Sequence, residues 1–439
     1  MKTSTDYLLF WGKAGGELPG EPAWHPAAYH NLDVAAVAGV LLDINPRRLA
    51  SMARLFGASP ANARQVIVTL IALHDVGKFA EAFQCKVQEH WPQPALGDFK
   101  HSNGPRHDQT GFDLREKLNF FELLGPSFDA GWRPSHVAAI WSAIAGHHGK
   151  PVDRNGSTET IDGARRAGIA NALAFATEAA SLFGPFSGLG KPKAPDLAVL
   201  SWSLAGLAVL ADWIGSNRDF FPYRRPDKTL ADYWSDIQPV AKRAVAVSGI
   251  EPVAAAEHSS AASLFPTLSK PSPLQALMSA VALPDGPLLA IVEDVTGSGK
   301  TEAAMLLAAR LIGDSRAYGL FFVLPTMATA NAMFEQLGET YRRLFCAAAP
   351  PSLVLAHGRR ALHTGFQASI LRQSLSQRSE RVAEAQGVQS SAVCAAWVAD
   401  DRRKSSRRMS VWAPSIRRFS ARCRRAIQRC GCAASATVC

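Results

Sequence analysis

The sequence predicts a multidomain protein in which a mostly helical domain, residues 1–240, precedes a partial α/β lobe, residues 273–404. Three observations support this prediction. Apolar residues recur at helical spacing through the first part. The second part changes to a strand, a glycine-rich turn and a helix, the pattern that opens a parallel α/β sheet. Residues 405–439 have no apolar period, and we expect them to form a disordered tail after an Ala/Ser/Pro-rich linker over 241–272.

The net charge of +10 does not mark the main part of the chain as a nucleic-acid binder. Residues 405–439 hold eight Arg, no Lys and no acidic residue, and subtracting those eight charges leaves +2 for residues 1–404. The three cysteines before the tail, Cys85, Cys346 and Cys394, are scattered and fit a reducing compartment. The longest apolar stretch, Ala198–Ala211, is too short to cross a bilayer. We therefore expect a cytoplasmic protein without a membrane segment.

The helical domain is predicted from four segments with apolar residues at helical spacing. They are Val34–Leu42, Arg64–Leu73, Val137–Ile144 and Leu197–Ile214. Pro and Gly residues separate them and mark the turns.

Histidine and aspartate residues stand at the ends of these helices or on their apolar faces. The set in chain order is His30, His74, Asp75, His107, His147, His148 and Asp212. The His74–Asp75 pair ends a nearly all-apolar run, where an uncompensated charge would cost several kcal/mol. Imidazole and carboxylate together suit divalent transition metals such as Mn, Fe, Co, Ni or Zn. One carboxylate can bridge two ions about 3.5–4 Å apart. A single histidine is more often structural, but the ordered set favours a metal centre.

This pattern resembles the HD superfamily, and more closely the HD nuclease domain of the CRISPR-associated helicase–nuclease of type I systems. The resemblance begins at WGKAGGELPGEPAWHPAAYHNLDVAAVA, from Trp11, and continues through ADWIGSN, which contains Asp212. It implies an all-α HD domain with two divalent metals. One metal would be held by His30, His74, Asp75 and Asp212, and the other by Asp75, His107, His147 and His148.

The same resemblance implies that His74, Asp75 and Lys78 are catalytic, with Lys78 near the scissile phosphate. An ordinary solvated lysine is the alternative for Lys78. Ser216 and Asn217 are candidates for contacts behind the metal ligands or with substrate. We expect His25, His90, His101 and His136 not to be ligands.

The α/β lobe begins with a phosphate-binding loop. Pro287–Glu293 is a predicted strand, Glu302–Leu311 a predicted helix, and the second strand and helix are expected over Tyr318–Leu324 and Met327–Leu337. Backbone N–H groups of the glycine-rich turn would close on phosphate oxygens at the helix N-terminus. Lys300 would reach the β and γ phosphates and Thr301 would ligate Mg²⁺, although Asp294 stands where the strict motif has its first Gly.

The variant TGSGKT resembles the loop of superfamily 2 helicases, whose lobes are RecA-like. Gln275 resembles the adenine-reading glutamine of that family, and Thr326 and Thr329 match its strand-gripping motif, with helix N-capping as the alternative. The expected Mg-ATP residues are Gln275, Thr296, Gly297, Ser298, Gly299, Lys300 and Thr301.

The helicase pattern stops before its catalytic Asp-Glu pair and its second lobe. Asp400–Asp401 lies in a helical polar context and does not replace that pair. Codons permitted for Met409–Arg418, read one base upstream, can encode DVGVGTIDQA, which the family would carry after ADDRRK. We hypothesise a frameshift near Lys404, which sequencing the gene would test.

The expected function is metal-dependent cleavage of single-stranded DNA in antiviral defence. In the full-length family a guide-RNA surveillance complex recruits the enzyme. We expect ATP not to stimulate cleavage by this chain, because the helicase activity would be lost. Two alternatives remain: a phosphohydrolase for nucleotides or small phosphoesters, and an inactive pseudogene product.

Overall fold

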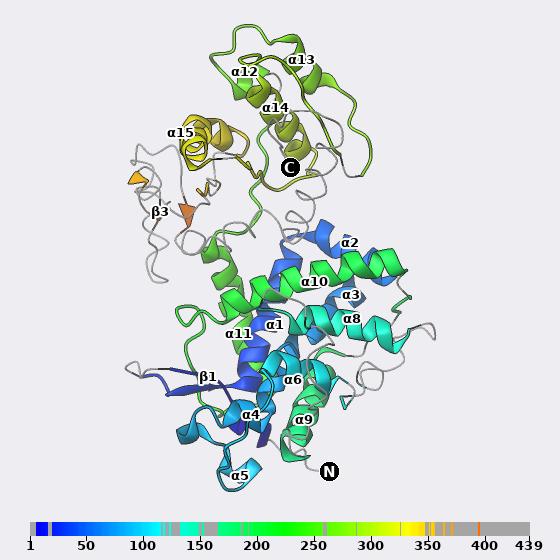
Figure 1. Ribbon diagram of the computed structural model, residues 1–439, viewed down its shortest axis with the longest axis vertical. Coiled ribbons are helices and arrows are strands. Elements are labelled where there is room, and N and C mark those ends of the chain that lie inside the picture. Colours follow the sequence, from blue (N-terminus) through cyan, green and yellow to red (C-terminus); the bar gives the residue numbers. More distant parts are fainter. Residues whose placement is uncertain are drawn as a thin grey trace. The chain divides into compact units, whose positions relative to one another are not determined.

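The computed structural model describes most of residues 6–371 together with Cys394–Ala395. It leaves out residues 16–19, most of 119–131, 149–165 and 347–369, a few single positions, and the rest of the chain after Leu371. The expected tail, Asp400–Asp401 and the frameshift position therefore lie outside the described residues. The chain divides into two compact units, residues 1–246 and 247–439 (Figure 1).

In the described residues, unit 1 is helical apart from one short ribbon. Its longer elements are β1 (Trp11–Ala14), β2 (Trp24–Pro26), α1 (Ala27–Asp43), α2 (Pro46–Phe56), α3 (Pro60–Ala72), α6 (His107–Leu114), α8 (Pro134–Ala145), α9 (Arg166–Phe183), α10 (Ala194–Gly215) and α11 (Leu230–Ser248). Short turns of helix connect them: η1 (Asp6–Leu9), η2 (Val76–Phe79), α4 (Glu81–Gln84), η3 (Gln88–His90) and α5 (Gln93–Leu96). β1 and β2 pair antiparallel. The four segments predicted as helices all lie within helices, except that Leu73 follows the last residue of α3.

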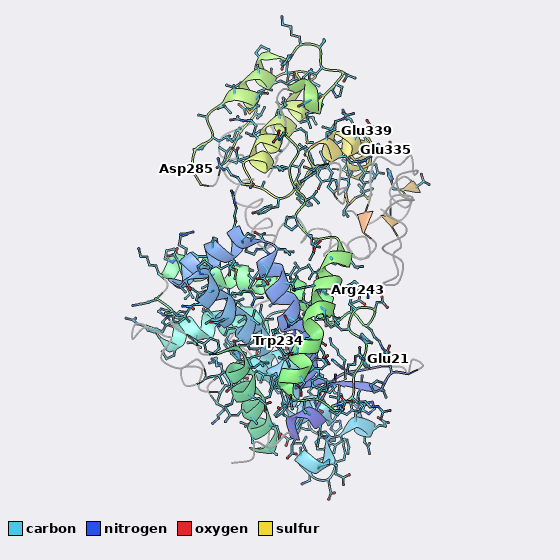
Figure 2. All side chains as sticks on the ribbon, turned by 180° about the vertical axis from the view of Figure 1, so that it is seen from behind. Glu21, Trp234, Arg243, Asp285, Glu335 and Glu339 are labelled. Atoms are coloured by element: carbon cyan, nitrogen blue, oxygen red, sulfur yellow. The ribbon has the colours of Figure 1, made fainter. Side chains whose placement is uncertain are left out.

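Helix α1 is the centre of unit 1. Every residue from Ala27 to Leu42 is buried, which is what a helix that is apolar on most faces requires. Helices α3 and α10 pack directly against it (Figure 1). Helix α11 joins this core through Tyr233, whose ring stacks on Tyr29 with centroids 3.7 Å apart. Trp234, also on α11, packs against Phe183 of α9 (Figure 2).

Two glycines allow helices to approach closely where the polar residues gather. A Cβ on Gly215, at the end of α10, would lie 2.9 Å from Val34 Cγ2 and 3.0 Å from its Cα. A Cβ on Gly77 in η2 would lie only 1.9 Å from the carbonyl oxygen of His107. These contacts set α10 against α1 and η2 against α6.

Helix α10 is longer than the apolar stretch recognised in the sequence. It has 22 residues with a mean hydropathy of 1.8 over its most apolar window, so by length it is able to cross a membrane, contrary to our expectation. Helices α1 and α2 meet the same criterion only as a pair bent by 103°. However, 67% of the α10 window is buried inside the protein. We interpret α10 as a core helix of unit 1.

Unit 2 contains α12 (Ala261–Leu264), α13 (Pro273–Ala280), α14 (Lys300–Gly313), α15 (Met327–Arg343) and the two-residue parallel pair β3 (Ile370–Leu371) and β4 (Cys394–Ala395). Its core includes Leu264, Met305, Ile312, Leu337 and Tyr341. The helices predicted over 302–311 and 327–337 are present as parts of α14 and α15.

The expected linker over 241–272 differs from what the structure shows. Helix α11 continues through residue 240 to Ser248, and the units divide after Ala246. Leu264 is fully buried in the core of unit 2, and Ala255 forms a bridge with Phe345. Composition alone did not reveal that these apolar residues would pack.

The two strands expected in unit 2 are not formed. In the described residues of 287–293 the chain is irregular, and Leu289 and Ile291 are 60% and 77% exposed. In 318–324 only Phe322 makes an isolated bridge. A parallel strand needs hydrogen-bonded neighbours on its edges, and the described part of unit 2 does not provide them for these segments. The RecA-like lobe therefore stays a prediction.

Candidate metal centre

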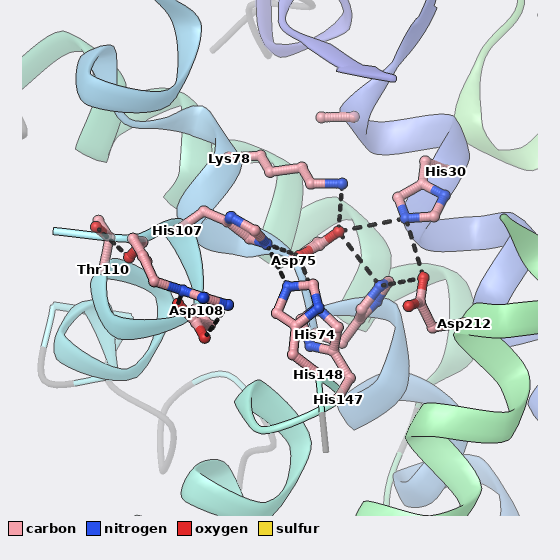
Figure 3. A network of polar contacts seen from close by, with 12 residues as sticks. His30, His74, Asp75, Lys78, His107, Asp108, Thr110, His147, His148 and Asp212 are labelled. Atoms are coloured by element: carbon pink, nitrogen blue, oxygen red, sulfur yellow. Dashed lines mark hydrogen bonds and ion pairs between the residues drawn. The ribbon is translucent and has the colours of Figure 1, made fainter. Parts of the chain in front are cut away.

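Five separate segments bring the predicted histidines and aspartates to one place inside unit 1, and a sixth adds Lys78 (Figure 3). His30 lies in the first turns of α1, His74–Asp75 in the turn between α3 and η2, and His107 begins α6. His147 and His148 follow α8, Asp212 lies near the end of α10, and Lys78 lies in η2. All seven residues expected to bind metal are thus brought together.

Asp75 is the centre of this arrangement, and its two carboxylate oxygens face different partners. Oδ2 lies 3.3 Å from His30 Nε2, 3.5 Å from His74 Nε2 and 2.5 Å from Lys78 Nζ. Oδ1 lies 3.3 Å from the Nε2 atoms of both His107 and His147. One carboxylate therefore joins two groups of imidazoles.

Asp212 completes the first group. Its Oδ1 lies 3.6 Å from His30 Nε2 and 3.8 Å from His74 Nε2. His148 completes the second group, with its Nε2 3.0 Å from His107 Nε2. The candidate ligand atoms of His30, His74 and Asp75 lie within 4.8 Å of one another, and so do those of His107, His147 and His148.

The protein backbone selects the ring nitrogen that faces the centre in two of the histidines. His74 Nδ1 lies 2.9 Å from the carbonyl oxygen of Ile71, and His147 Nδ1 lies 3.3 Å from that of Ile144. A carbonyl only accepts, so in each ring Nδ1 carries the hydrogen and donates it. In the neutral ring this leaves a free lone pair on Nε2, directed at Asp75.

The turn that carries Asp75 is held by Asn31, which sequence reasoning did not single out. The Asn31 side chain accepts a hydrogen bond from the Asp75 N–H at 3.1 Å and donates one to the Ala27 carbonyl at 2.8 Å. Asn31 is fully buried. The signal available in the sequence is an amide residue directly after His30 within an otherwise apolar helix.

The centre is buried around Asp75, where it contains polar atoms without partners, whereas His107 is half-buried and His148 is exposed. His30, His74, Asp75 and His147 are each at most 2% exposed, and Asp212 is 9% exposed. Among the described residues, His30 Nε2, His74 Nε2 and Asp75 Oδ1 are buried and make no hydrogen bond. Burying such atoms without a partner is costly.

The electrostatics favour the protonation states that metal binding needs. Burial raises the pKa of Asp75, but Lys78 and the histidines around it outweigh burial and hold that pKa well below its usual value. Burial also raises the pKa of Asp212, but His74 and Lys13 outweigh burial and hold that pKa well below its usual value. Burial lowers the pKa of His30 and of His74. Both carboxylates are therefore ionised and these two imidazoles neutral near pH 7.

Two histidines of the second group, His147 and His148, differ from each other. Burial and the neighbouring His147 and His107 lower the pKa of His148 to about 4. Burial opposes protonation of His147, but the Asp75 carboxylate outweighs it and raises the pKa of His147. Neutral imidazoles, carboxylates and orphaned lone pairs fit divalent transition metals.

The histidines expected not to be ligands lie elsewhere. His25 Nε2 lies 2.9 Å from Asp33 Oδ2, and His25 Nδ1 accepts a hydrogen bond from Arg224 N. His136 Nδ1 accepts from the Arg133 backbone, and His101 is exposed. His90 lies 6.3 Å from the Trp24 ring.

The two polar residues after Asp212 have different positions. Ser216 Oγ donates to Asp212 Oδ1 at 2.7 Å, so it contacts a candidate ligand. The Asn217 side chain instead accepts from the Asp219 N–H at 2.9 Å and caps its own turn.

In unit 2 the predicted phosphate-binding loop leads into α14. Gly297 and Gly299 have φ angles of 84° and 83°, which only glycine adopts readily, and Gly299 caps the helix that begins at Lys300. Lys300 Nζ donates to the carbonyl oxygens of Asp294 and Val295 at 2.8 and 2.6 Å.

Gln275, the expected adenine-reading residue, packs against this loop. Its Oε1 accepts from the Ser272 N–H and its Nε2 donates to the Gly299 carbonyl at 3.4 Å. The hydroxyl of Thr326 accepts from Thr329 N, so the N-capping alternative describes this pair at the start of α15. Nucleotide binding by Gln275 and residues 296–301 stays a prediction.

Residues 11–221 match the protein family described as Cas3, HD domain. The chain is 31% identical over 432 residues to the CRISPR-associated endonuclease/helicase Cas3 of Escherichia coli, covering 90% of this chain and 46% of that protein. It is 29% identical over 433 residues to the protein of the same description from Thermus thermophilus, with coverages of 94% and 43%. The crystal structure of T. fusca Cas3-ATP shares the fold, with a TM-score of 0.69, 24% identity and coverages of 91% and 42%. The chain spans less than half the length of these curated relatives.

Proposed function

The chain belongs to the Cas3 family through its HD domain, residues 11–221, and from this premise we propose that unit 1 is a metal-dependent nuclease that cleaves single-stranded DNA. Its relatives are named CRISPR-associated endonuclease/helicase. We extend this to a role in antiviral defence, in the cytoplasm, with a guide-RNA surveillance complex as partner. A chain of the same fold occurs in a solved structure of a CRISPR RNA-guided surveillance complex.

One observation supports the proposal more than any other: the two oxygens of Asp75 face two separate sets of imidazole nitrogens, each at 3.3–3.5 Å. We propose that His30, His74, Asp75 and Asp212 would hold one divalent ion and Asp75, His107, His147 and His148 a second. Mn, Fe, Ni and Co all suit these ligands. A pair of such ions supplies an activated water and neutralises the charge of an attacked phosphate.

The residues of the chain orient this chemistry. The carbonyl oxygens of Ile71 and Ile144 fix the tautomers of His74 and His147, and Asn31 fixes the backbone of Asp75. Asp75 and His74 are each 2% exposed, so bulk water is excluded from them, which strengthens each electrostatic interaction there. This rigidity would hold a phosphodiester and a water in a fixed relation.

We propose that Lys78 binds the phosphate of the substrate. Its Nζ lies 2.5 Å from Asp75 Oδ2 and 5.5 Å from the centre of the Phe83 ring. It is 4% exposed, and burial lowers its pKa. An ammonium held beside the bridging carboxylate would contact a non-bridging oxygen of the bound phosphodiester. We therefore assign Lys78 to transition-state charge stabilisation, and His74 and Asp75 to the catalytic metal site.

For unit 2 we propose nucleotide binding without helicase activity. Mg-ATP would bind at Gln275 and at residues 296–301, but Lys300 is bound to loop carbonyls and residues 288–295 pair with no strand. We propose that this chain does not couple ATP to strand separation.

The proposal is tested by incubating purified full chain with 5′-labelled single-stranded DNA in Mn²⁺, Co²⁺ or Ni²⁺. We expect cleavage by the wild type and by His136→Ala, which lies outside the centre, and none by Asp75→Ala. Equal cleavage by Asp75→Ala and the wild type would contradict the proposal. A parallel panel of nucleotides and small phosphoesters tests the alternative substrate class, and turnover of that panel without cleavage of DNA would replace the proposed substrate.

A further inference from the structure

A second lysine contacts the metal centre indirectly, from the side of Asp212. Lys13, in β1, donates from Nζ to Ser216 Oγ at 2.8 Å. Ser216 Oγ in turn donates to Asp212 Oδ1 at 2.7 Å. Lys13, Ser216 and Asp212 thus form a continuous chain of hydrogen bonds, which we call the Lys13 relay. It ends on the carboxylate oxygen that faces His30 and His74.

The direction of each bond in the Lys13 relay follows from the chemistry of its groups. An ammonium has donors only, so Ser216 Oγ must accept from Lys13. A serine hydroxyl has one hydrogen, and an ionised carboxylate only accepts. The Ser216 hydrogen therefore goes to Asp212 Oδ1 and occupies one of its lone-pair directions. The remaining lone pairs of that carboxylate are left for an ion between His30 and His74.

Lys13 is carried by a backbone that is fixed on both sides. β1 is paired with β2, with Lys13 opposite His25. A Cβ on Gly12 would lie 2.6 Å from Ala27 Cα, so the strand rests directly on the start of α1. The salt bridge between Glu21, which is labelled in Figure 2, and Arg218 is 2.8 Å long and ties the segment after β1 to the turn that follows Ser216.

Gln84 sets β1 against the element that carries Lys78. Its Oε1 accepts from Trp11 N at 3.2 Å, and its Nε2 donates to the carbonyl oxygens of Trp11 at 2.9 Å and of Lys78 at 2.7 Å. Gln84 is fully buried. One amide side chain thus fixes the position of β1, which carries Lys13, relative to η2, which carries Lys78. Lys13 acts on Asp212 and Lys78 contacts Asp75.

We propose that Lys13 is a positioning residue of the nuclease centre, which acts through Ser216 to orient the Asp212 carboxylate toward His30 and His74. The inference rests on the proposed function. Lys13 does not contact a candidate ligand atom directly in this arrangement, in contrast to Lys78. Its positive charge opposes the binding of a cation, so its contribution is to geometry and not to the strength of metal binding.

This combination predicts a split between turnover and metal affinity. Lys13→Met keeps the length of the side chain and removes the ammonium. It lowers kcat about tenfold, the usual effect of removing a group that orients a ligand, while the Kd for Mn²⁺ is unchanged or smaller. Lys13→Arg, which restores a cationic donor, keeps kcat within about threefold of the wild type. Lys86→Met, a change at an exposed lysine outside the relay, leaves both quantities unchanged.

A double variant tests whether Lys13 acts through Ser216. Because the hydrogen bonds that join Lys13 to Asp212 run through Ser216, Lys13→Met/Ser216→Ala has the kcat of Ser216→Ala alone. A product of the two single losses would overturn the inference. So would an unchanged kcat in Lys13→Met, or a weakening of Mn²⁺ binding in parallel with a lower melting temperature, which indicates a merely structural role.

Failure of the proposed function would be seen separately. If the wild type binds Mn²⁺ but cleaves no DNA, the nuclease proposal fails, and the relay is judged by the electron paramagnetic resonance spectrum of bound Mn²⁺, which reports the geometry of its ligands. Lys13→Met and Ser216→Ala should then change this spectrum in the same way, and Lys86→Met should leave it as in the wild type. A wild-type spectrum in Lys13→Met would overturn the relay.

Discussion

The carbonyl oxygen of His107 occupies the space where Gly77 would carry a side chain, 1.9 Å from the position of an added Cβ. Gly77 lies two residues after Asp75, and His107 is a partner of Asp75 Oδ1 at 3.3 Å. The absence of one methyl group therefore allows α6 to bring its first residue to the bridging carboxylate. This close approach is the structural condition for the second group of imidazoles.

Gly77→Ala is expected to move His107 away from Asp75. The new methyl group would clash with backbone atoms of α6, which cannot rotate aside as a side chain can. We therefore expect the free energy of unfolding to fall by about 1–3 kcal/mol or more. Urea denaturation measures this loss, and metal analysis shows whether ions of the second group are lost with it. Gly313→Ala is the matched control, since a Cβ there meets nothing within 4 Å. A Gly77→Ala protein with wild-type stability and metal content would contradict this account.

Asn31→Ala is expected to destabilise the turn of Asp75 without removing a metal ligand. It leaves the buried N–H of Asp75 without its acceptor, at a cost of about 1–3 kcal/mol. Both the melting temperature of the metal-free protein and the nuclease activity should fall. Retention of both would show that Asn31 does not position Asp75.

The metal-free protein is expected to lose stability as the pH falls below neutral. The folded state lowers the pKa of His148 from 6.5 to about 4 and lowers those of His30 and His74. The unfolded chain therefore takes up these protons first, and stability decreases as the pH drops through 6.5 toward 4. The raised pKa of His147 acts in the opposite direction, as a contribution that is present at low pH and lost as the pH rises. Three histidines have lowered pKa values and one has a raised pKa, so we expect the folded state to be less stable at acid pH.

Urea midpoints of chelator-treated protein at pH 7.5 and 5 measure this dependence. Asp75 and Asp212 extend this loss of stability to lower pH, because their pKa values in the folded state are well below 3.8. The stability that the two carboxylates contribute is lost as the pH falls below 3.8 through those folded-state values. His148→Gln removes one of the titrating groups and should reduce the difference between the two midpoints. Equal stability at pH 7.5 and 5 would contradict the lowered pKa values of these three histidines.

ATP is expected not to change the rate of DNA cleavage. The predicted strand before the phosphate-binding loop is not formed, and Lys300 is hydrogen-bonded to Asp294 and Val295. Cleavage rates of single-stranded DNA with and without Mg-ATP should agree, and Lys300→Ala should cleave at the wild-type rate. Stimulation by ATP that Lys300→Ala abolishes would show that unit 2 couples nucleotide to the nuclease.

The clustering of His74, Asp75 and Asp212 was predictable from the sequence because these residues break an apolar pattern. His74 and Asp75 end an apolar helix, and Asp212 lies on another, so each needs a polar partner that only distant segments can supply. The residues that hold the centre together were not predictable in this way. Asn31, Gln84 and Lys13 act through hydrogen bonds to backbone or to Ser216, and no spacing in the sequence marks such bonds.

Unit 2 shows the limit of local patterns. The helices around Met305 and Leu337 were predicted from their apolar patterns, and in the structure their apolar faces pack in one core. The strands over 287–293 and 318–324 were expected from equally apolar sequences but depend on neighbours from elsewhere in a sheet. The segment over 253–265 has the composition of a linker, yet Leu264 packs in the core.

The claim on which the account depends is that Asp75 joins two metal ions, and metal content tests it most directly. Protein loaded with Mn²⁺, freed of excess ion and measured by elemental analysis should hold about two ions per chain. Asp75→Asn, of nearly the same size, should hold at most one, while His136→Ala should match the wild type. Two ions on Asp75→Asn, or none on the wild type, would contradict the central claim.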